Sequence, residues 1–280
     1  MEYVIKSIPY FNLERIADSG QAFRLHMIDD THMELVAKGK YLQIADLGNN
    51  QYAFSCDEND FNSLWMDYFD LNRSYEDIVT TINPEDDYLI AAEQFGRGIR
   101  ILKQDIWEIT ISYIISQRRS IPSIMTSVEK ISKRWGNKIV MPILSEPFVH
   151  PLKDNYYEFP DSNTLANVSI NDISETGVGY RAPYILSAAN DFASGKLSED
   201  YMNNLDDDTL FAVLMAMYGV GKKVANCIML FGFARTGRFP IDVWIERIVN
   251  KYYNGHFDTT QYPDTAGIMQ QFMFYYERRK

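Results

Sequence analysis

The fold is decided by Leu214–Val249, which reads LMAMYGVGKKVANCIMLFGFARTGRFPIDVWIERIV. An apolar helix is predicted to end at Gly219-Val220-Gly221, and a second helix begins directly after it, so residues 211–235 are predicted to form a helix-hairpin-helix. Glycines permit the tight turn, and the new helix leaves backbone N–H groups free to bind an anion such as a DNA phosphate. Gly219, Val220 and Gly221 are therefore candidate DNA contacts, although many helical hairpins use such a turn for geometry alone.

Lys223 is a candidate nucleophile because it lies in the first turn of the second helix. A free lysine amine is almost entirely protonated at neutral pH, so it reacts only when desolvation or nearby positive potential favours the neutral form. The start of a helix supplies such potential. Taken alone, the Lys222-Lys223 pair is more typical of a solvated surface.

Asp242 follows Phe239-Pro240-Ile241 and precedes an amphipathic segment, so it is predicted to be a helix N-cap. A cap of this kind stabilises a helix by about 1 kcal/mol. Backbone N–H bonds and the helix dipole also keep the carboxylate ionised, which is the state that stabilises a positively charged sugar in a transition state. The structural and the catalytic interpretation are compatible.

The rest of the chain predicts an α+β fold. An antiparallel sheet is expected in the first 55 residues, and helical periodicity begins near Asp57. Asp105 is predicted to cap a buried helix, Ile106–Ser116, and Pro122 to open the next one. Residues 135–161 are predicted to form an irregular loop. The predicted strands are Tyr3–Ile8, Ala22–Ile28, Met33–Ala37 and Tyr41–Asp46.

Two domains are expected, a small N-terminal sheet domain over residues 1–100 and a helical body over residues 101–280. The boundary is expected between residues 90 and 105, and a cleft is expected between the two domains.

Composition restricts the function further. The net charge of −11 argues against a protein that coats nucleic acid by bulk electrostatics, so any DNA contact must be local. The two cysteines match no disulfide or metal-ligand spacing, and neither a metal nor another cofactor is expected. No signal peptide or membrane-spanning stretch is evident, so a cytoplasmic protein without membrane contact is expected.

On these motifs the sequence resembles the 8-oxoguanine DNA glycosylases of the helix-hairpin-helix Gly/Pro-Asp superfamily. YGVGKKVANCIMLF followed by FPIDVW is similar to their hairpin, catalytic lysine and catalytic aspartate, which fall on Lys223 and Asp242. The resemblance implies a TATA-binding-protein-like N-terminal sheet domain and a helical glycosylase body. It also implies a bifunctional DNA N-glycosylase/AP lyase that excises 8-oxoguanine, works without a cofactor, and acts as a monomer on duplex DNA at a prokaryotic nucleoid.

Other segments carry the same resemblance. SGQAFR, residues 19–24, resembles the family's strand in which a glycine carbonyl accepts the N7 proton of 8-oxoguanine, a role that falls on Gly20. AGIMQQFMF, residues 266–274, resembles the family's helix in which a glutamine bonds the base edge and an aromatic ring stacks on the base. These roles fall on Gln270 and Phe274, with Cys227 on the other face of the base. Taken alone, Phe274 and Cys227 are more typical of core packing.

The sequence also departs from the family pattern. Gln117-Arg118-Arg119-Ser120 stands where the family has an asparagine-rich wedge, and Ser123 stands where eukaryotic members carry an arginine. We expect Gln117 and Arg118 to contact DNA and the preference for the opposite base to be loose. Trp244 replaces a histidine found near the lesion's 5′ phosphate in some members, and it is a weaker candidate DNA contact.

Two other functions stay open at this point. The first is a glycosylase for alkylated bases, against which Lys223 and the Gly20 segment argue. The second is a non-catalytic helix-hairpin-helix DNA-binding protein, against which the acidic net charge argues.

Overall fold

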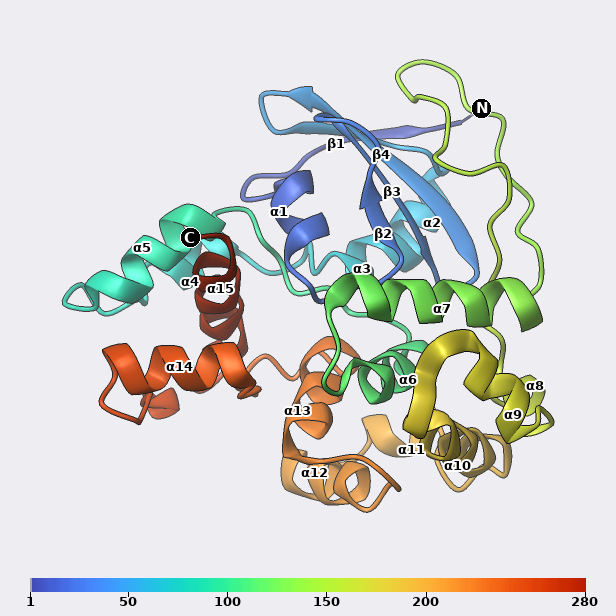
Figure 1. The fold of residues 1–280 in the computed structure, drawn as a ribbon. Helices are drawn as coiled ribbons and strands as arrows, with labels where there is room; N and C mark the ends of the chain where they lie inside the picture. Colours follow the sequence, from blue (N-terminus) through green and yellow to red (C-terminus); the bar gives the residue numbers. More distant parts are fainter. Residues whose placement is uncertain (1) are drawn as a thin grey trace.

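The computed structural model describes residues 2–280 and contains a five-stranded antiparallel sheet beside a larger helical body (Figure 1). The strands lie in the spatial order β1-β5-β4-β3-β2. This arrangement confirms the predicted α+β fold. The strands are β1 Val4–Ser7, β2 Leu25–Met27, β3 His32–Ala37, β4 Lys40–Gly48 and β5 Gln51–Phe54.

The sheet differs from the prediction in one strand. Gln51–Phe54 was not expected to pair, yet it lies between β4 and β1 and bonds to both. Gly48, Asn49 and Asn50 all have positive φ and reverse the chain into this hairpin. Glycine and asparagine are the residues that adopt this conformation most readily, so the turn itself was readable from sequence.

A helix was also missed in this region. α1, Leu13–Asp18, follows β1, and Asn12 caps it by accepting a hydrogen bond from the Arg15 backbone N–H at 2.9 Å. Six residues are too few to establish a helical period in a sequence. The predicted strand Ala22–Ile28 is correspondingly shorter, because the chain straightens only at Leu25.

The remainder of the chain is helical, as expected. Asp105 caps α6 by accepting from the Glu108 N–H at 2.8 Å, and α7 has Pro122 in its first turn, so both predictions are confirmed. The helices after α1 are α2 Glu58–Asp60, α3 Met66–Tyr68, α4 Tyr75–Val79, α5 Asp87–Gly96, α6 Ile106–Ser116, α7 Ile121–Trp135, α8 Ser162–Ala166, α9 Ile170–Ile173, α10 Ala182–Ala193, α11 Glu199–Asn203, α12 Asp207–Met215, α13 Lys222–Phe231, α14 Val243–Tyr252 and α15 Ala266–Arg279. Short π and 3-10 turns lie at Phe61–Trp65, Ser174–Val178, Gly179–Arg181 and Thr259–Gln261.

Two large hydrophobic cores, with two small clusters beside the sheet, stabilise the molecule. One lies under the sheet and includes Leu42, Ile44 and Phe54, all fully buried, and the other fills the helical body around Ile114 and Ile228. Residues 136–161 form the expected irregular loop, which contains a single bridge between Lys138 and Tyr157. The exact position of a domain boundary along the chain stays a prediction.

The C-terminal helix packs against a segment near the N-terminus. α15 packs against α5 and α14, and it also reaches the segment after α1 (Figure 1). The Gln271 amide donates to the Ser19 carbonyl at 2.7 Å, and Arg278 donates to the Asp18 carbonyl at 2.6 Å. Residues near 20 and near 275 therefore share one wall of the space between the sheet and the helical body.

Candidate active site

The hairpin between α12 and α13 has the predicted geometry. Gly219 has φ +82°, and a Cβ on it would lie 2.3 Å from the Tyr184 ring, so only glycine fits there. Gly221 is the N-cap of α13 and has nothing within 4 Å of a Cβ position. The side chain of Gln117 donates to the Gly219 carbonyl at 3.1 Å, which fixes the turn beside the 117–120 segment.

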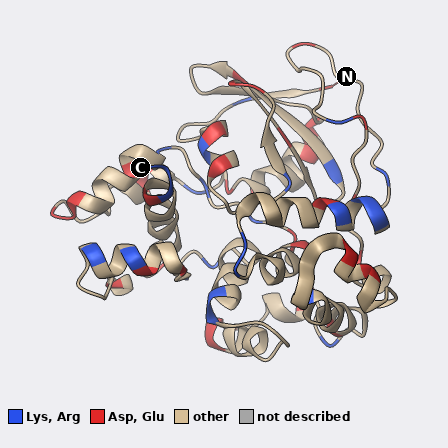
Figure 2. Cartoon of the chain, viewed as in Figure 1, with Lys and Arg blue, Asp and Glu red and all other residues tan. Residues whose placement is uncertain are grey.

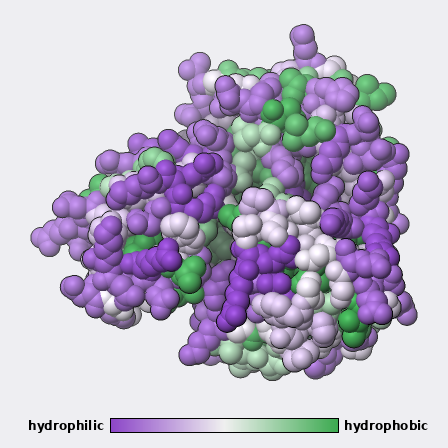
Figure 3. Space-filling view, in the orientation of Figure 1, coloured by the Kyte–Doolittle hydropathy of each residue, from purple (hydrophilic) through white to green (hydrophobic). Residues whose placement is uncertain are grey.

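A cleft of about 1230 Å³ lies between the sheet domain and the helices. Figure 3 shows the surface hollowed beside the lobe of α5, α14 and α15, with apolar side chains in the hollow. The cleft confirms the one expected from the sequence. Nine of the predicted site residues line it: Gly20, Gln117, Arg118, Lys223, Cys227, Asp242, Trp244, Gln270 and Phe274. Gly219, Val220 and Gly221 are not among the lining residues, since they lie at the hairpin beside it.

One side of the cleft is formed by Lys223, Cys227 and Asp242, which we call the hairpin wall. Lys223 is half-buried, whereas Lys222 next to it is exposed. The Lys223 Nζ atom lies 4.8 Å from the centre of the Tyr113 ring, and within residues 2–280 it makes no ion pair shorter than 4 Å. The two adjacent lysines therefore occupy different environments, and Lys223 is the one that lines the cleft.

Cys227 lies one helical turn after Lys223, on the same side of α13. Burial raises the pKa of the Cys227 thiol, and the neighbouring Lys223 ammonium opposes that effect. The thiol therefore stays protonated at neutral pH and presents a small, apolar surface to the cleft.

Asp242 is the N-cap of α14, as predicted. Its Oδ1 atom accepts hydrogen bonds from the backbone N–H groups of Trp244 at 3.0 Å and Ile245 at 2.9 Å. Two N–H donors and the positive end of the helix dipole place positive electrostatic potential at the Asp242 side chain. The cap also fixes the orientation of the side chain, and within residues 2–280 its Oδ2 atom accepts no hydrogen bond.

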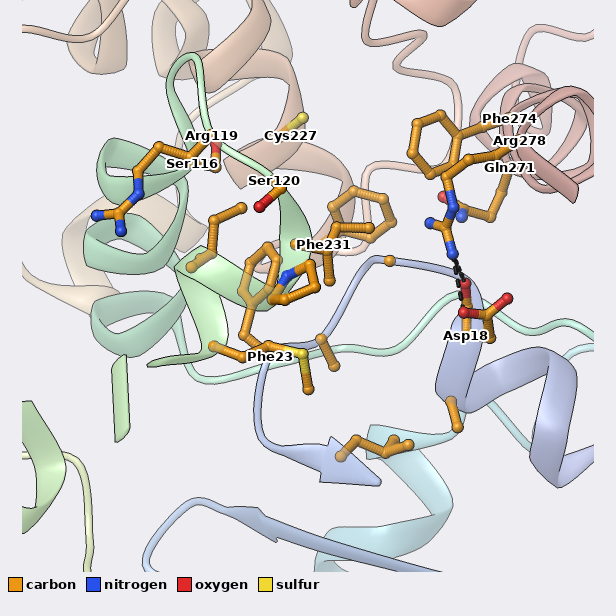
Figure 4. A pocket seen from close by; sticks show the side chains of 18 of the residues that line it. Asp18, Phe23, Ser116, Arg119, Ser120, Cys227, Phe231, Gln271, Phe274 and Arg278 are labelled. Carbon is orange, nitrogen blue, oxygen red and sulfur yellow. Dashed lines mark hydrogen bonds and ion pairs between the residues drawn. The ribbon is translucent and has the colours of Figure 1, made fainter. Parts of the chain in front are cut away.

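The opposite side of the cleft is formed by Gly20, Gln270, Phe274 and Arg278, which we call the C-terminal wall (Figure 4). Gly20 has φ +77°, and a Cβ there would lie 2.7 Å from Arg278 Nη1 and 3.2 Å from Phe274 Cε1. Only glycine fits between them. Gln270 is 5% exposed, and its Oε1 atom is buried without a hydrogen-bond partner among residues 2–280.

The segment Gln117–Ser120 forms the rim of the cleft. Arg118 is exposed and has φ +52°, a conformation that is uncommon for a residue with a side chain. Arg119 is held in place, because its Nη1 donates to the Gly177 carbonyl at 2.7 Å and its Nε to the Ser123 hydroxyl at 3.1 Å. Arg119 is therefore engaged within the protein, whereas Arg118 is exposed to solvent at the cleft.

Tyr180 and Arg181 were not predicted as site residues. Arg181 donates to the Gln117 carbonyl and to the Val178 carbonyl, and Tyr180 is 55% exposed beside it. A signal was present in the sequence, because Gly177-Val178-Gly179 repeats the Gly-Val-Gly pattern of the hairpin. Both glycine turns are therefore hydrogen-bonded to the Gln117–Ser120 segment, one through Gln117 and the other through Arg119.

Charge is distributed locally, as the sequence predicted. Figure 2 shows Lys and Arg in separate short segments, including the start of α13 and one side of α14, with no continuous basic stripe on the visible face. Within residues 2–280, no group of three or more His, Cys, Asp or Glu side chains is arranged to hold a metal ion. The helices of the same residues include none that is long and apolar enough to cross a membrane.

A hairpin that presents a half-buried lysine, a capping aspartate beyond it, and a cleft against a small sheet domain define a helix-hairpin-helix DNA glycosylase. A family model described as "8-oxoguanine DNA glycosylase, N-terminal domain" matches residues 4–110. A "probable N-glycosylase/DNA lyase" of Methanothermobacter thermautotrophicus is 33% identical, over 75% of this chain and 73% of the relative. The chain therefore belongs to the N-glycosylase/DNA lyase family of 8-oxoguanine glycosylases, as the sequence predicted.

Solved structures agree with this assignment. The structure of MBOgg1 in complex with a low-affinity DNA ligand covers 100% of this chain and 99% of its own, with 32% identity and a TM-score of 0.87. The Clostridium acetobutylicum 8-oxoguanine glycosylase/lyase was solved bound to duplex DNA with cytosine opposite 8-oxoG. The match covers 99% of this chain and 96% of that one, with 30% identity and a TM-score of 0.90. A 3-methyladenine DNA-glycosylase from Archaeoglobus fulgidus shares the fold at 15% identity and a TM-score of 0.75.

Proposed function

We propose that this protein excises 8-oxoguanine from duplex DNA and then cleaves the abasic strand, with Lys223 as the nucleophile. The observation that carries the proposal is the placement of Lys223 and Asp242 in one cleft, which Gly20 and Phe274 also line. The family assignment supports the same chemistry.

The reaction begins when the target nucleotide rotates out of the duplex into the cleft, at a cost of about a few kcal/mol in lost stacking. The neutral Lys223 amine attacks C1′ of the sugar. The C1′–N9 bond breaks, and the base leaves with a proton. The sugar carries positive charge in the transition state, and the Asp242 carboxylate stabilises this charge and assists the deprotonation of the Lys223 ammonium.

The covalent adduct then opens its sugar ring to a Schiff base between Nζ and C1′. A proton leaves C2′ and the bond from C3′ to the phosphate oxygen breaks, which cuts the strand on the 3′ side. Water hydrolyses the Schiff base and releases Lys223. These steps use only groups of the protein, the substrate and water. The proposed mechanism therefore requires no cofactor.

DNA binding is assigned to both sides of the cleft mouth. The Gly219-Val220-Gly221 turn offers backbone N–H groups to a phosphate, and Gln117, Arg118 and Trp244 line the adjacent rim. Arg118 is placed to occupy part of the gap left by the rotated base. Because Ser123 is engaged by Arg119, we propose that discrimination of the opposite base is loose. Comparable excision rates opposite all four bases would support this, and a strong cytosine preference would contradict it.

An alkylated-base glycosylase is the alternative within this fold. Such an enzyme needs the hairpin and the aspartate but no amine nucleophile, so the half-burial of Lys223 favours the lyase. We also propose that the protein acts in the cytoplasm of a prokaryote, since Cys56 and Cys227 are both free thiols.

The test is borohydride trapping on a duplex that contains 8-oxoguanine opposite cytosine. Wild-type protein should form a stable covalent complex, which Lys223→Gln should abolish. Lys222→Gln is the matched control, because Lys222 is the adjacent but exposed lysine. Trapping that persists in Lys223→Gln would assign the nucleophile elsewhere, and wild-type protein that neither traps nor releases the base would refute the proposed function.

A further inference from the structure

Two side chains of the C-terminal wall contain a buried polar atom that has no partner. Residues 2–280 contain seven buried side-chain nitrogen or oxygen atoms without a hydrogen-bond partner. Of these, just two belong to residues that line the cleft, and they are Gln270 Oε1 and Arg278 Nη1. A buried polar group without a partner costs about 1–3 kcal/mol, so two of them on one wall of a substrate cleft indicate a ligand that satisfies both.

The two atoms have complementary hydrogen-bonding character. Gln270 Oε1 accepts, and Arg278 Nη1 donates. Gln270, Phe274 and Arg278 follow one another at intervals of four residues on α15, so they lie on one face of the helix, with the aromatic ring between the two polar groups. A flat base stacked on Phe274 would therefore present one edge to Gln270 and another edge to Arg278.

Arg278 is held rigidly in this position. Its Nη2 donates to the Asp18 carbonyl at 2.6 Å and to Asp18 Oδ1 at 2.9 Å, and its guanidinium carbon lies 5.4 Å from the centre of the Phe274 ring. Figure 4 shows the guanidinium between Phe274 and Asp18, with a second terminal nitrogen turned away from the aspartate. The Asp18 contacts therefore use one terminal nitrogen and leave the other to a different partner.

Gly20 identifies the edge of the base that Arg278 faces. Arg278 Nη1 lies 2.7 Å from the position that a Gly20 Cβ would occupy, so the guanidinium adjoins the Gly20 backbone directly. The family resemblance assigns the N7 proton of 8-oxoguanine to the Gly20 carbonyl, and the carbonyl oxygen at C8 is bonded to the atom next to N7. A donor beside Gly20 is thus placed for this oxygen.

We propose that Arg278 is a specificity-determining residue, whose Nη1 donates a hydrogen bond to the C8 carbonyl oxygen of the flipped 8-oxoguanine. This inference rests on the proposed function and extends it. Guanine has a C–H group at C8, so it would leave the arginine donor buried and unpaired. A site built around a hydrogen bond rejects the analogue that lacks the partner, which adds discrimination to the N7 contact.

The experiment compares wild-type protein with Arg278→Met, which keeps an unbranched apolar chain and removes the donors. Single-turnover base excision is measured on duplexes with 8-oxoguanine or with 8-thioguanine, in which a weakly accepting sulfur replaces the C8 oxygen and N7–H is retained. Strand cleavage at a preformed abasic site is measured in parallel, since it needs Lys223 but no base contact. Arg278→Lys serves as a second variant that retains the positive charge.

We expect wild-type protein to excise 8-oxoguanine about tenfold faster than 8-thioguanine. Arg278→Met should slow 8-oxoguanine excision about tenfold or more, excise both bases at similar rates, and cleave the abasic site within about twofold of wild type. Arg278→Lys should recover part of the preference for oxygen over sulfur. Cleavage of the abasic site also reports that the variant is folded.

Arg279→Met is the matched control. Arg279 is half-exposed and pairs with the same Asp18 carboxylate, so its loss removes an ion pair without the buried donor. It should keep the oxygen-to-sulfur preference of wild type. The inference would be overturned if Arg278→Met kept the wild-type ratio of 8-oxoguanine to 8-thioguanine excision rates. It would also be overturned if Arg279→Met lost this ratio to the same extent as Arg278→Met. Wild-type protein without 8-oxoguanine excision would refute the proposed function instead.

Discussion

The two walls of the cleft are built in different ways. Lys223, Cys227 and Asp242 of the hairpin wall lie within about 20 residues of one another in the sequence, and local elements position them. The C-terminal wall joins Gly20 to Phe274 and Arg278, which are more than 250 positions away. The catalytic side chains are therefore positioned by the starts of two neighbouring helices. The residues that would contact the base are instead brought together by the packing of the N-terminal segment against the C-terminal helix.

Asp242→Asn is the sharpest way to weaken the hairpin wall without disturbing the fold. The asparagine side chain can still accept from the Trp244 and Ile245 N–H groups, so α14 should remain capped. The negative charge is lost, and base excision should fall about 10²–10³-fold. Single-turnover excision and thermal unfolding should be measured together. A rate near that of wild type would remove Asp242 from the charge-stabilising role.

Phe274→Ala should weaken the C-terminal wall alone. Stacking of a base on an aromatic ring contributes about 1–3 kcal/mol, so 8-oxoguanine excision should fall about tenfold to a hundredfold. Cleavage of a preformed abasic site should change little, because that step depends on Lys223. This pattern is the opposite of Lys223→Gln, which should lose both activities. Equal losses of excision and abasic-site cleavage in Phe274→Ala would show that the two walls do not act separately.

Gly219→Ala tests the turn that supports the hairpin wall. A Cβ at this position meets the Tyr184 ring at 2.3 Å, and the backbone has φ +82°, so the free energy of unfolding should fall by about 1–3 kcal/mol. Gly221→Ala provides the matched comparison in denaturant unfolding, because its Cβ would meet nothing within 4 Å. Similar stabilities of the two variants would indicate that Tyr184 moves aside.

A pH-dependent effect is expected for the pair that connects the sheet to α6. Arg24 Nη1 lies 3.6 Å from Glu108 Oε2, and burial raises the pKa of Glu108 from 4.5 to about 7. The folded protein therefore holds this proton more tightly than the unfolded chain does. Stability from this group is fully present below pH 4.5 and declines as the pH rises through about 7.

Glu108→Gln removes this titration. The difference in unfolding free energy between wild type and variant should shift by about 3 kcal/mol in favour of the variant between pH 4.5 and pH 8. Urea unfolding at several pH values measures it. If the difference were the same at every pH, the pKa of Glu108 would be the same in the folded protein as in the unfolded chain.

Much of the hairpin wall could be predicted from the sequence. The glycine turn, the N-cap role of Asp242 and the capping of α6 by Asp105 all follow from residue type and position, and the structure confirms each one. The family resemblance also brought Gly20, Gln270 and Phe274 into one expected site. α1 and β5 were missed because each is a short element that gives no clear periodic signal.

Arg278 could not have been predicted in the same way. In the sequence it is one of three basic residues at the C-terminus, which are typical of a solvated tail. Its burial against Gly20 and its bonds to Asp18 exist only because α15 packs beside the end of α1. Arg181 likewise reaches the rim through its hydrogen bond to the Gln117 carbonyl, and Tyr180 lies beside Arg181.

The sequence by itself determined the hairpin, the nucleophile candidate, the capping aspartate and the family, because backbone conformation and helix capping depend on neighbouring residues. The tertiary structure alone decided that Lys223 is half-buried while Lys222 is exposed, and that Arg278 keeps a buried donor without a partner among residues 2–280. Burial and the pairing of polar groups depend on segments that are distant in the chain, so only the packed molecule specifies them.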